Sequence, residues 1–265
     1  MLSLSPKNHK PKSIIFLAMC FLFALGSQAE TIALSGIIRC PYVCSQEENK
    51  KGYIIDFAEA IFSQNNHTLT FMELPWSRAL SNAKRGDLDG LAGVYFRNVP
   101  SFIIPKKEQG FSELHFFVER DSTWNFEGFN SLQKISIGVT RDVSYGPIDS
   151  YIDRYKNDKR YINTVSGTST LSRTVKMILS KRTTATLEDL HVMRYHLHSN
   201  NQTTSLKAAG SLSGDNLYIA FPPSNNKSLE LSTMIAEGME RLRSTGELSK
   251  IMSKYGLTDW RFHPE

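Results

Sequence analysis

The sequence lacks the short motifs that mark the commonest enzyme classes. It contains no G-x-S-x-G nucleophile turn, no G-x-x-x-x-G-K phosphate loop and no G-x-G-x-x-G dinucleotide loop. His191, His196 and His198 crowd one segment, but their spacings do not share a helix face, and no H-E-x-x-H pattern accompanies them. The serine and glycine clusters at 166–170 and 210–214 are typical of turns. We therefore predict no metal site, no cofactor and no catalytic residue.

Long apolar runs are almost absent. The exception is IIFLAMCFLFALG at 14–26, which follows three lysines and no acid and precedes the small residues Ser27 and Ala29. This is the layout of a secretory signal over residues 1–29, with cleavage after Ala29. An uncleaved anchor is the alternative, but a spanning helix needs about 20 apolar residues. A lipid-modified Cys20 would need a small neighbour where the chain has Met19. The sequence thus predicts an exported, periplasmic protein.

Charge of one sign is not concentrated in the exported part. Removal of the signal removes three lysines and lowers the formal net charge from +5 to +2. No arginine-rich run remains to neutralise phosphates, so we expect no nucleic-acid partner. At this length the chain can form one large domain or two small ones.

Two cysteines remain after the signal, in RCPYVCS at 39–45. In an oxidising compartment Cys40 and Cys44 are expected to form a disulfide across a tight loop. The alternative is a redox site, because C-P-Y-C occurs in glutaredoxins, but here Val43 separates the pair. A reactive thiol also favours a helix N-terminus, and the next helical pattern starts only near Tyr53. The tightness of the loop leaves the bond itself a prediction.

The first half of the exported chain alternates strand and helix patterns. Strands are predicted at 31–39, 69–74 and 88–96, and helices at 52–66 and 75–85. Pro75 suits the start of the second helix, and Gly86 ends it. Strands joined by helices through short links imply a parallel sheet with right-handed crossovers.

Ligands of open parallel sheets bind at the carboxyl ends of the strands. The loop with Tyr42, the turn with Trp76 and Arg78, and the stretch after Val94 all belong to that edge. We predict that Tyr42, Trp76 and Arg78 contribute to a binding rim. The alternative is that Trp76 packs in the core, since large aromatics are mostly buried, and that Arg78 is solvated.

A second strand–helix series follows LHFFVER at 114–120. Its strands are predicted at 134–140, 161–166 and within TTATLED at 183–189, and its helices at 144–157, 170–182 and after 189. A further strand, NLYIAFP at 216–222, leads into a helical hairpin that ends at Gly256. We predict two α/β lobes: residues 30–118 plus 217–265 form lobe one, and residues 119–216 form an inserted lobe two. LHFFV and LYIAF would be the two crossing strands.

The order of several segments along the chain resembles that in a known family. The segments GYIIDFAEAI, LPWSRALSNAKRGDLDGLAG, FFV, ISIGVT, MILSKRTTATLED, LYIAF and GMERLRSTGELSKIMSKYGLTDW occur in that order. They resemble the periplasmic solute-binding proteins of family 3, the receptors of polar amino-acid ABC transporters, in a branch marked by P-W-x-R-A-L and a terminal G-L-x-D-W. The resemblance implies a two-lobed type II periplasmic-binding-protein fold. Each lobe would be a mostly parallel sheet flanked by helices.

The resemblance also implies a set of ligand-binding positions. After lobe one's third strand, members hold an α-carboxylate with a threonine and an arginine; here only Arg97 is available, and the alternative is a solvated loop arginine. An arginine suits a carboxylate because its planar group can donate two hydrogen bonds. In lobe two, Ser144 and Tyr145 stand near a backbone carboxylate cradle, with Asp142 close to the usual glycine. Ser144 could equally be a helix cap.

The family's ammonium-binding aspartate follows a lobe-two strand. In TTATLEDL the usual position is Thr184, while Asp189 falls on the ligand-facing position with Glu188 beside it. Paired acids there suit a cationic group. The alternative is a solvated acid at a helix start. The departures at Arg97, Asp142 and Thr184 imply that the solute need not be a standard amino acid.

The sequence thus predicts a monomeric extracytoplasmic receptor that closes on a small polar solute, an amino acid or related compound, for ABC-type uptake. Its partners would be the solute and an inner-membrane permease. The alternatives are a ligand-sensing lobe for a separate membrane signalling protein and, further behind, a dehydratase-like enzyme on the same fold.

Overall fold

The computed structural model describes residues 2, 29–45, 50–141, 143–167 and 169–262 of the chain. The predicted signal segment therefore lies almost wholly outside the described residues, as does Asp142. No described helix combines the length and apolar character that a bilayer crossing needs.

All strands of the described part join one sheet in the order β2-β1-β3-β8-β4-β7-β5-β6. Their bounds are β1 Thr31–Gly36, β2 Thr68–Phe71, β3 Gly90–Tyr95, β4 Gly110–Glu119, β5 Ile137–Thr140, β6 Ile162–Val165, β7 Ala185–Asp189 and β8 Leu206–Ala220. The α-helices are α1 Tyr53–Ser63, α2 Trp76–Arg85, α3 Asp149–Tyr155, α4 Thr170–Leu179, α5 Leu190–Ser199, α6 Ser228–Ser244 and α7 Glu247–Ser253. The alternation predicted from the sequence is confirmed.

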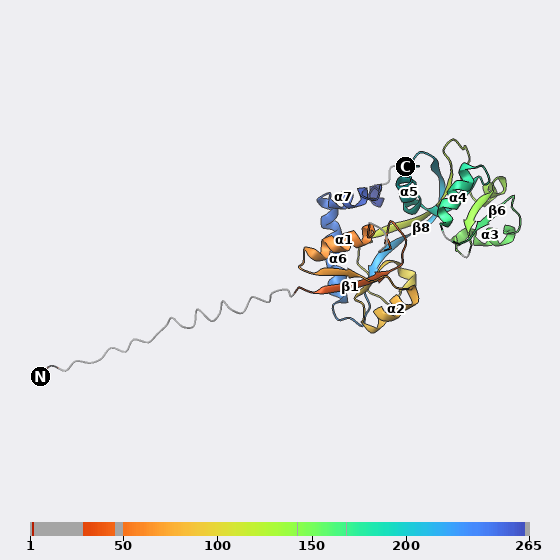
Figure 1. Ribbon diagram of the computed structural model, residues 1–265. Coiled ribbons are helices and arrows are strands. Elements are labelled where there is room, and N and C mark those ends of the chain that lie inside the picture. Colours follow the sequence, from red (N-terminus) through yellow and green to blue (C-terminus); the bar gives the residue numbers. More distant parts are fainter. Residues whose placement is uncertain (1, 3–28, 46–49, 142, 168, 263–265) are drawn as a thin grey trace.

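The sheet divides into two lobes (Figure 1). The first lobe holds β1, β2 and β3 with α1, α2, α6 and α7, and the second lobe holds β5, β6 and β7 with α3, α4 and α5. Strands β1–β2, β1–β3, β5–β6 and β5–β7 pair in parallel, as expected from helix crossovers. The central strands β4 and β8 run antiparallel to each other and to their outer neighbours, and they connect the lobes. They contain the predicted crossing segments, whereas the exact division of the chain between the lobes stays a prediction.

Each lobe has apolar clusters on both faces of its part of the sheet. In the first lobe, α1 packs against α6 and α7 on one face, where Phe57, Ile61 and Phe62 are fully buried, while α2 covers the other. In the second lobe, α4 and α5 cover one face, and Phe116 and Ile137 belong to the cluster on the other. In each lobe, apolar side chains therefore pack against both faces of the sheet. This leaves the sheet's edge as the place where polar side chains can gather.

Two local predictions have clear outcomes. Helix α2 ends at Gly86, which adopts the left-handed conformation with φ of 87° and donates its N–H to the Ala83 carbonyl. The cluster GSLSG is not a turn but lies within the long strand β8. Its Gly214 leaves room for the ring of Phe111 on β4, since a Cβ there would lie 2.3 Å from the ring.

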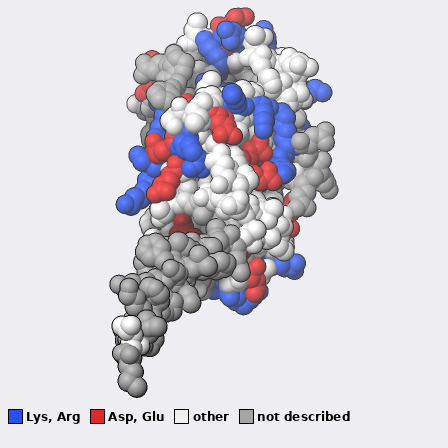
Figure 2. Space-filling view, turned by 90° about the vertical axis from the view of Figure 1, so that its left-hand side faces the viewer, with Lys and Arg blue, Asp and Glu red and all other residues white. Residues whose placement is uncertain are grey.

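The Cys40–Cys44 disulfide is formed, in the loop after β1. It closes the turn that carries Tyr42, whose ring is buried against Tyr53 of α1. On the face shown in Figure 2, lysine and arginine side chains are interspersed with aspartate and glutamate.

Candidate functional site

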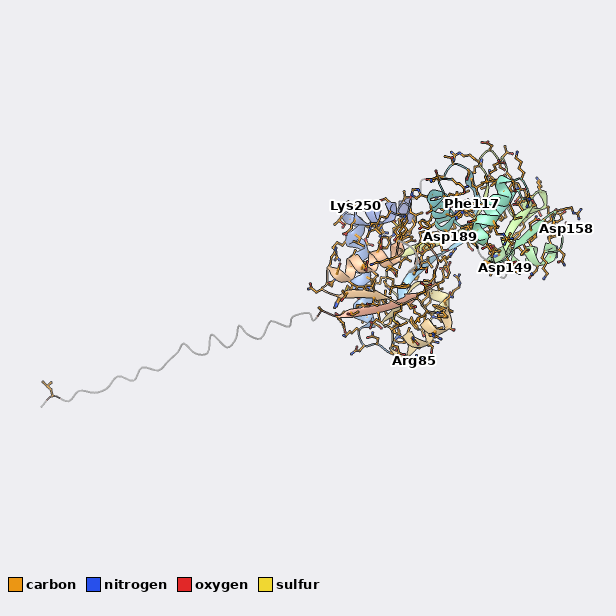
Figure 3. The ribbon with its side chains drawn as sticks, in the orientation of Figure 1. Arg85, Phe117, Asp149, Asp158, Asp189 and Lys250 are labelled. Carbon is orange, nitrogen blue, oxygen red and sulfur yellow. A yellow bond between two sulfur atoms is a disulfide. The ribbon has the colours of Figure 1, made fainter. Side chains whose placement is uncertain are left out.

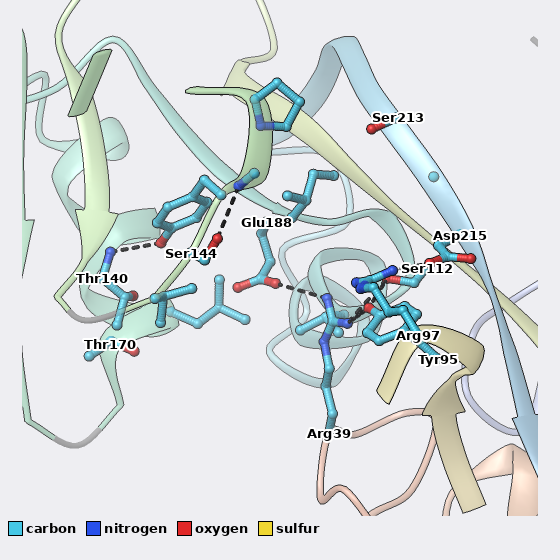
Figure 4. Close-up of a pocket in the computed structure, with 18 of the residues that line it drawn as sticks. Arg39, Tyr95, Arg97, Ser112, Thr140, Ser144, Thr170, Glu188, Ser213 and Asp215 are labelled. Atoms are coloured by element: carbon cyan, nitrogen blue, oxygen red, sulfur yellow. Dashed lines mark hydrogen bonds and ion pairs between the residues drawn. The ribbon is translucent and has the colours of Figure 1, made fainter. Parts of the chain in front are cut away.

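A cavity of about 950 Å³ lies between the two lobes. The first lobe contributes Arg39, Tyr95 and Arg97 to its wall, and the second contributes Ser144, Tyr145 and Glu188 (Figure 4). The strands β4 and β8 pass behind it and add Ser112 and Asp215. Because the wall is built from both lobes, a molecule in the cavity would contact both.

Arg39 is the cation at the base of this cavity. It lies in the loop directly after β1, and its side chain is 30% exposed. One guanidinium nitrogen donates to the hydroxyls of Tyr95 at 2.8 Å and Ser112 at 3.1 Å. The other lies 3.4 Å from Asp189 and 3.8 Å from Glu188, so it spans the gap between the lobes. Burial alone would lower the pKa of Arg39, but the negative charge of Asp189 raises it above its ordinary value.

Asp189 lies beneath Arg39 at the end of β7, at the junction of the lobes (Figure 3). It has no exposed surface. The Ser112 hydroxyl donates to its carboxylate at 2.7 Å, and the Tyr42 hydroxyl lies 2.8 Å from both carboxylate oxygens. The backbone N–H groups of His191 and Val192 also donate to it, which makes Asp189 the N-cap of α5. Four donors and an arginine thus compensate the burial of this carboxylate.

Tyr42 therefore belongs to the support of the cavity rather than to its wall. Its side chain is 1% exposed, and it is not among the lining residues. Burial and the neighbouring Asp189 carboxylate raise its pKa well above the usual value, so its hydroxyl stays protonated. The sequence placed Tyr42 and Asp189 at the correct sheet edge, but both contact Arg39 or its partners instead of open space.

Of the adjacent acids Glu188 and Asp189, Glu188 is the one that reaches the cavity. It precedes Asp189 on β7, and because successive side chains alternate across a strand, the two carboxylates point to different surroundings. Its side chain is 26% exposed and faces Arg39 (Figure 4). One oxygen accepts the backbone N–H of Asp189 at 2.8 Å. Burial raises the pKa of Glu188 above its ordinary value.

Arg97 forms a second cationic group at the cavity's outer side. It lies in the short 3-10 helix Phe96–Asn98 after β3, pairs with Asp215 of β8, and its side chain is 63% exposed. Its guanidinium carbon lies 4.0 Å from the centre of the Tyr95 ring, within the range of a cation–π contact. A planar, exposed guanidinium held in this way can exchange an acid partner for a ligand carboxylate.

Ser144 and Tyr145 line the second lobe's side. The Tyr145 hydroxyl accepts the backbone N–H of Thr140 at 2.8 Å, while Ser144 and the Tyr145 N–H both donate to Asp149 at 2.6 Å. Asp149 thus fixes the loop that leads from β5 to α3. Of these residues, Ser144 is exposed, whereas Tyr145 is 4% exposed.

Trp76 and Arg78 are not brought to the cavity. Trp76 is partly buried against the apolar cluster under α2, and Arg78 is exposed on the helix surface. Neither lines the cavity. The prediction located the first turn of α2 at the sheet edge, but that position alone does not determine the directions in which the side chains of this turn point.

Arg39 is the residue that reasoning from the sequence missed. Its signal was available, because it is the last residue of the strand predicted at 31–39 and directly precedes Cys40 of the disulfide loop. The described residues contain no group of three or more His, Cys, Asp or Glu side chains placed to hold a metal ion. The wall carries two arginines and two acids in a hollow of ligand size, which suits a molecule with charges of both signs.

No protein-family model matches the sequence, and no curated protein matches it. Solved structures are similar. The L-cystine solute receptor of Neisseria gonorrhoeae in its unliganded open conformation is 17% identical with a TM-score of 0.67, over 89% of this chain and 97% of that chain. The second substrate-binding domain of a putative amino-acid ABC transporter from Streptococcus pneumoniae is 18% identical with a TM-score of 0.62, over 86% and 99%.

A histidine kinase sensor domain with similarity to periplasmic binding proteins is 20% identical with a TM-score of 0.58, over 85% of this chain and 95% of that chain. At these identities the likeness concerns the fold. The protein has the type II periplasmic-binding-protein fold, as the sequence predicted.

Proposed function

We propose that this protein is an extracytoplasmic receptor that closes on a small polar solute, an amino acid or related compound, and delivers it to a membrane ABC transporter. The observation that carries the proposal is the cavity between the lobes, where Arg39 of the first lobe faces Glu188 of the second. The similar structures include a solute receptor and a transporter's binding domain, which supports the same role.

The position of the cavity supplies the mechanism. A ligand favours a closed state only to the extent that it binds that state more tightly than the open one. A solute that touches one lobe gains nothing from closure, whereas a solute held by Arg39 and Glu188 gains contacts as the lobes approach. The antiparallel strands β4 and β8 would bend at the hinge. No chemical step is involved.

The charges favour a zwitterionic solute. A ligand carboxylate would bind Arg97 and Arg39, and a ligand ammonium would bind Glu188. The Arg39–Glu188 separation of 3.8 Å is at the long end of an ion pair, so a ligand can replace it without breaking a short hydrogen bond. Ser144 and Tyr145 would contact the solute from the second lobe, while Tyr42 and Asp189 would act by holding Arg39 in place.

The partner in the membrane distinguishes two roles. Uptake requires an ABC permease, whereas a sensory role requires a membrane signalling protein. The similarity to a histidine kinase sensor domain supports the sensory role as the alternative. In the first case cells without this protein lose uptake of the solute. In the second, uptake is unchanged and only the transcriptional response to the solute is lost.

The direct test is a thermal-shift screen of the purified protein against amino acids, polyamines, small peptides and organic acids. A solute at 100 times its dissociation constant adds about 2.7 kcal/mol of stability. The variants Arg39→Gln and Glu188→Gln should each abolish most of the shift, because each removes a charge from one lobe. Arg154→Gln and Glu237→Gln, on exposed helix surfaces, are the matched controls. Full solute affinity in both cavity variants, or silence across the panel, contradicts the proposal.

A further inference from the structure

A second hollow of about 280 Å³ lies beside α5 and shares no lining residue with the cavity between the lobes. It is enclosed by α5, the end of β4, the beginning of β8 and the loop before β8. Gly256, which follows α7 of the first lobe, closes one side. The hollow therefore also has walls from both lobes, at a place that the proposed function does not use.

The floor of this hollow is apolar. Phe117 of β4, Leu190 and Leu197 of α5, and Leu206 of β8 belong to one buried cluster, and each is at most 6% exposed. Leu190, Arg194, Leu197 and His198 follow the helical spacing that places them on one face of α5, so the apolar floor and part of the rim come from the same helix.

The rim of the hollow is cationic. Arg120, Arg194 and Lys207 are among its lining residues, and no aspartate or glutamate is. Within the described part of the chain, no ion pair joins these three residues to an acid, so no carboxylate of the protein competes with an anion for them. Burial lowers the pKa of Arg194, the direction expected for a cation without an acid nearby.

Gly256 allows the first lobe to approach this hollow closely. It adopts φ of 69°, and a Cβ there would lie 2.7 Å from the imidazole of His198. The close approach of the backbone at Gly256 therefore depends on the absence of a side chain. It places the segment after α7 in contact with the C-terminal turn of α5.

We propose that this hollow is a second binding site, for a small organic oxyanion that carries an apolar group. The carboxylate or phosphate binds Arg120 and Arg194, which can donate paired hydrogen bonds to either. The apolar group lies on Phe117 and Leu197. The volume is at the low end of ligand-binding pockets, so the ligand is of the size of a substituted benzene ring or a short acyl chain.

The test is calorimetric titration of the purified protein with phenyl phosphate and with benzoate, which separate the two anion chemistries. Inorganic phosphate, which lacks the apolar group, should bind more weakly than phenyl phosphate. We expect saturable binding that weakens about tenfold or more in Arg194→Gln, the effect of losing one charge-assisted hydrogen bond. Arg120→Gln is the second variant, should Arg194→Gln fail to fold.

Two control variants test whether the ligand binds in this hollow. Arg154→Gln, an exposed arginine of α3 without a side-chain partner among the described contacts, should leave the affinity unchanged. Arg97→Gln should also leave it unchanged, because Arg97 lines the other cavity and its side chain is 63% exposed, so its loss leaves no buried charge unpaired. Absence of saturable binding of both ligands at millimolar concentration overturns the proposal, as does an equal loss in either control. Loss of affinity in Arg97→Gln alone places the anion between the lobes and also overturns the proposal.

Discussion

The charge of Asp189 should support the whole junction between the lobes, and Asp189→Asn tests this. Asparagine keeps the size of the side chain and is itself a good N-cap, so the substitution removes the charge while the cap of α5 can persist. The wild-type carboxylate accepts from Ser112, Tyr42 and two backbone N–H groups and lies 3.4 Å from Arg39. The variant leaves Arg39 without its buried counter-charge.

The magnitude follows from these contacts. A hydrogen bond to a charged group contributes about 1.5–3 kcal/mol and a neutral one about 0.5–1.5 kcal/mol. Removing one partner of a buried ion pair costs about 3–5 kcal/mol. Because Arg39 is 30% exposed and can be partly hydrated, we expect the low end, about 3 kcal/mol. For a chain of this length that corresponds to a fall in melting temperature of roughly 6–12 °C.

The assay is urea unfolding followed by tryptophan fluorescence, with calorimetry for the melting temperature. The slope against urea should be unchanged, since the surface exposed on unfolding is the same. Asp153→Asn is the matched control, because its side chain is 75% exposed, and it should stay within about 0.5 kcal/mol of wild type. A loss in Asp189→Asn below about 1 kcal/mol would refute the argument that this carboxylate needs its charge.

Three further predictions concern single residues. Burial raises the pKa of Glu188, so affinity for a solute with an ammonium group should fall as the pH drops from 7 to 5; titration calorimetry should show this in wild type and not in Glu188→Gln. Burial also raises the pKa of Tyr53 well above 10, so the unfolded chain loses that proton first and stability falls as the pH rises past about 10. Tyr53→Phe should reduce the total loss of stability between pH 9 and 11 by about 1.4 kcal/mol, roughly 0.7 kcal/mol per pH unit, in urea titrations, and an unchanged slope counts against the assignment. Gly238→Ala should cost about 1–3 kcal/mol in the same assay, because its Cβ would lie 2.6 Å from Ile61 of α1, whereas Glu237→Ala beside it should cost little.

The fold was accessible from the sequence because each signal was local. Apolar spacing located the helices, Gly86 located one helix end, and short links between strands implied parallel pairing. The length of β8 was not accessible. Its GSLSG segment has the composition of a turn, and only the pairing with β4 and the contact between Gly214 and Phe111 make it a strand.

The candidate site was only partly accessible for a related reason. The sheet edge was predictable, and Arg97, Ser144, Tyr145 and Glu188 lie at the cavity there. Which of two adjacent acids faces the cavity depends on the pleat of β7, and Asp189 turns to the buried side. Arg39 depends on long-range partners on β4 and β7 that no local pattern reveals.

The pairing of β4 with β8 has a consequence for protein engineering. Gly110, where β4 begins, and Leu217, near the end of β8, are direct cross-strand partners. Antiparallel partners can be joined by a turn of only two residues. The segment between these two residues, which includes β4 and the second lobe, is thus a cassette whose two ends lie side by side, the geometry that tolerates domain insertion and circular permutation. Grafting a foreign cassette at this seam would exchange Ser144, Tyr145 and Glu188 for another half-site while Arg39 and Arg97 stay in the recipient.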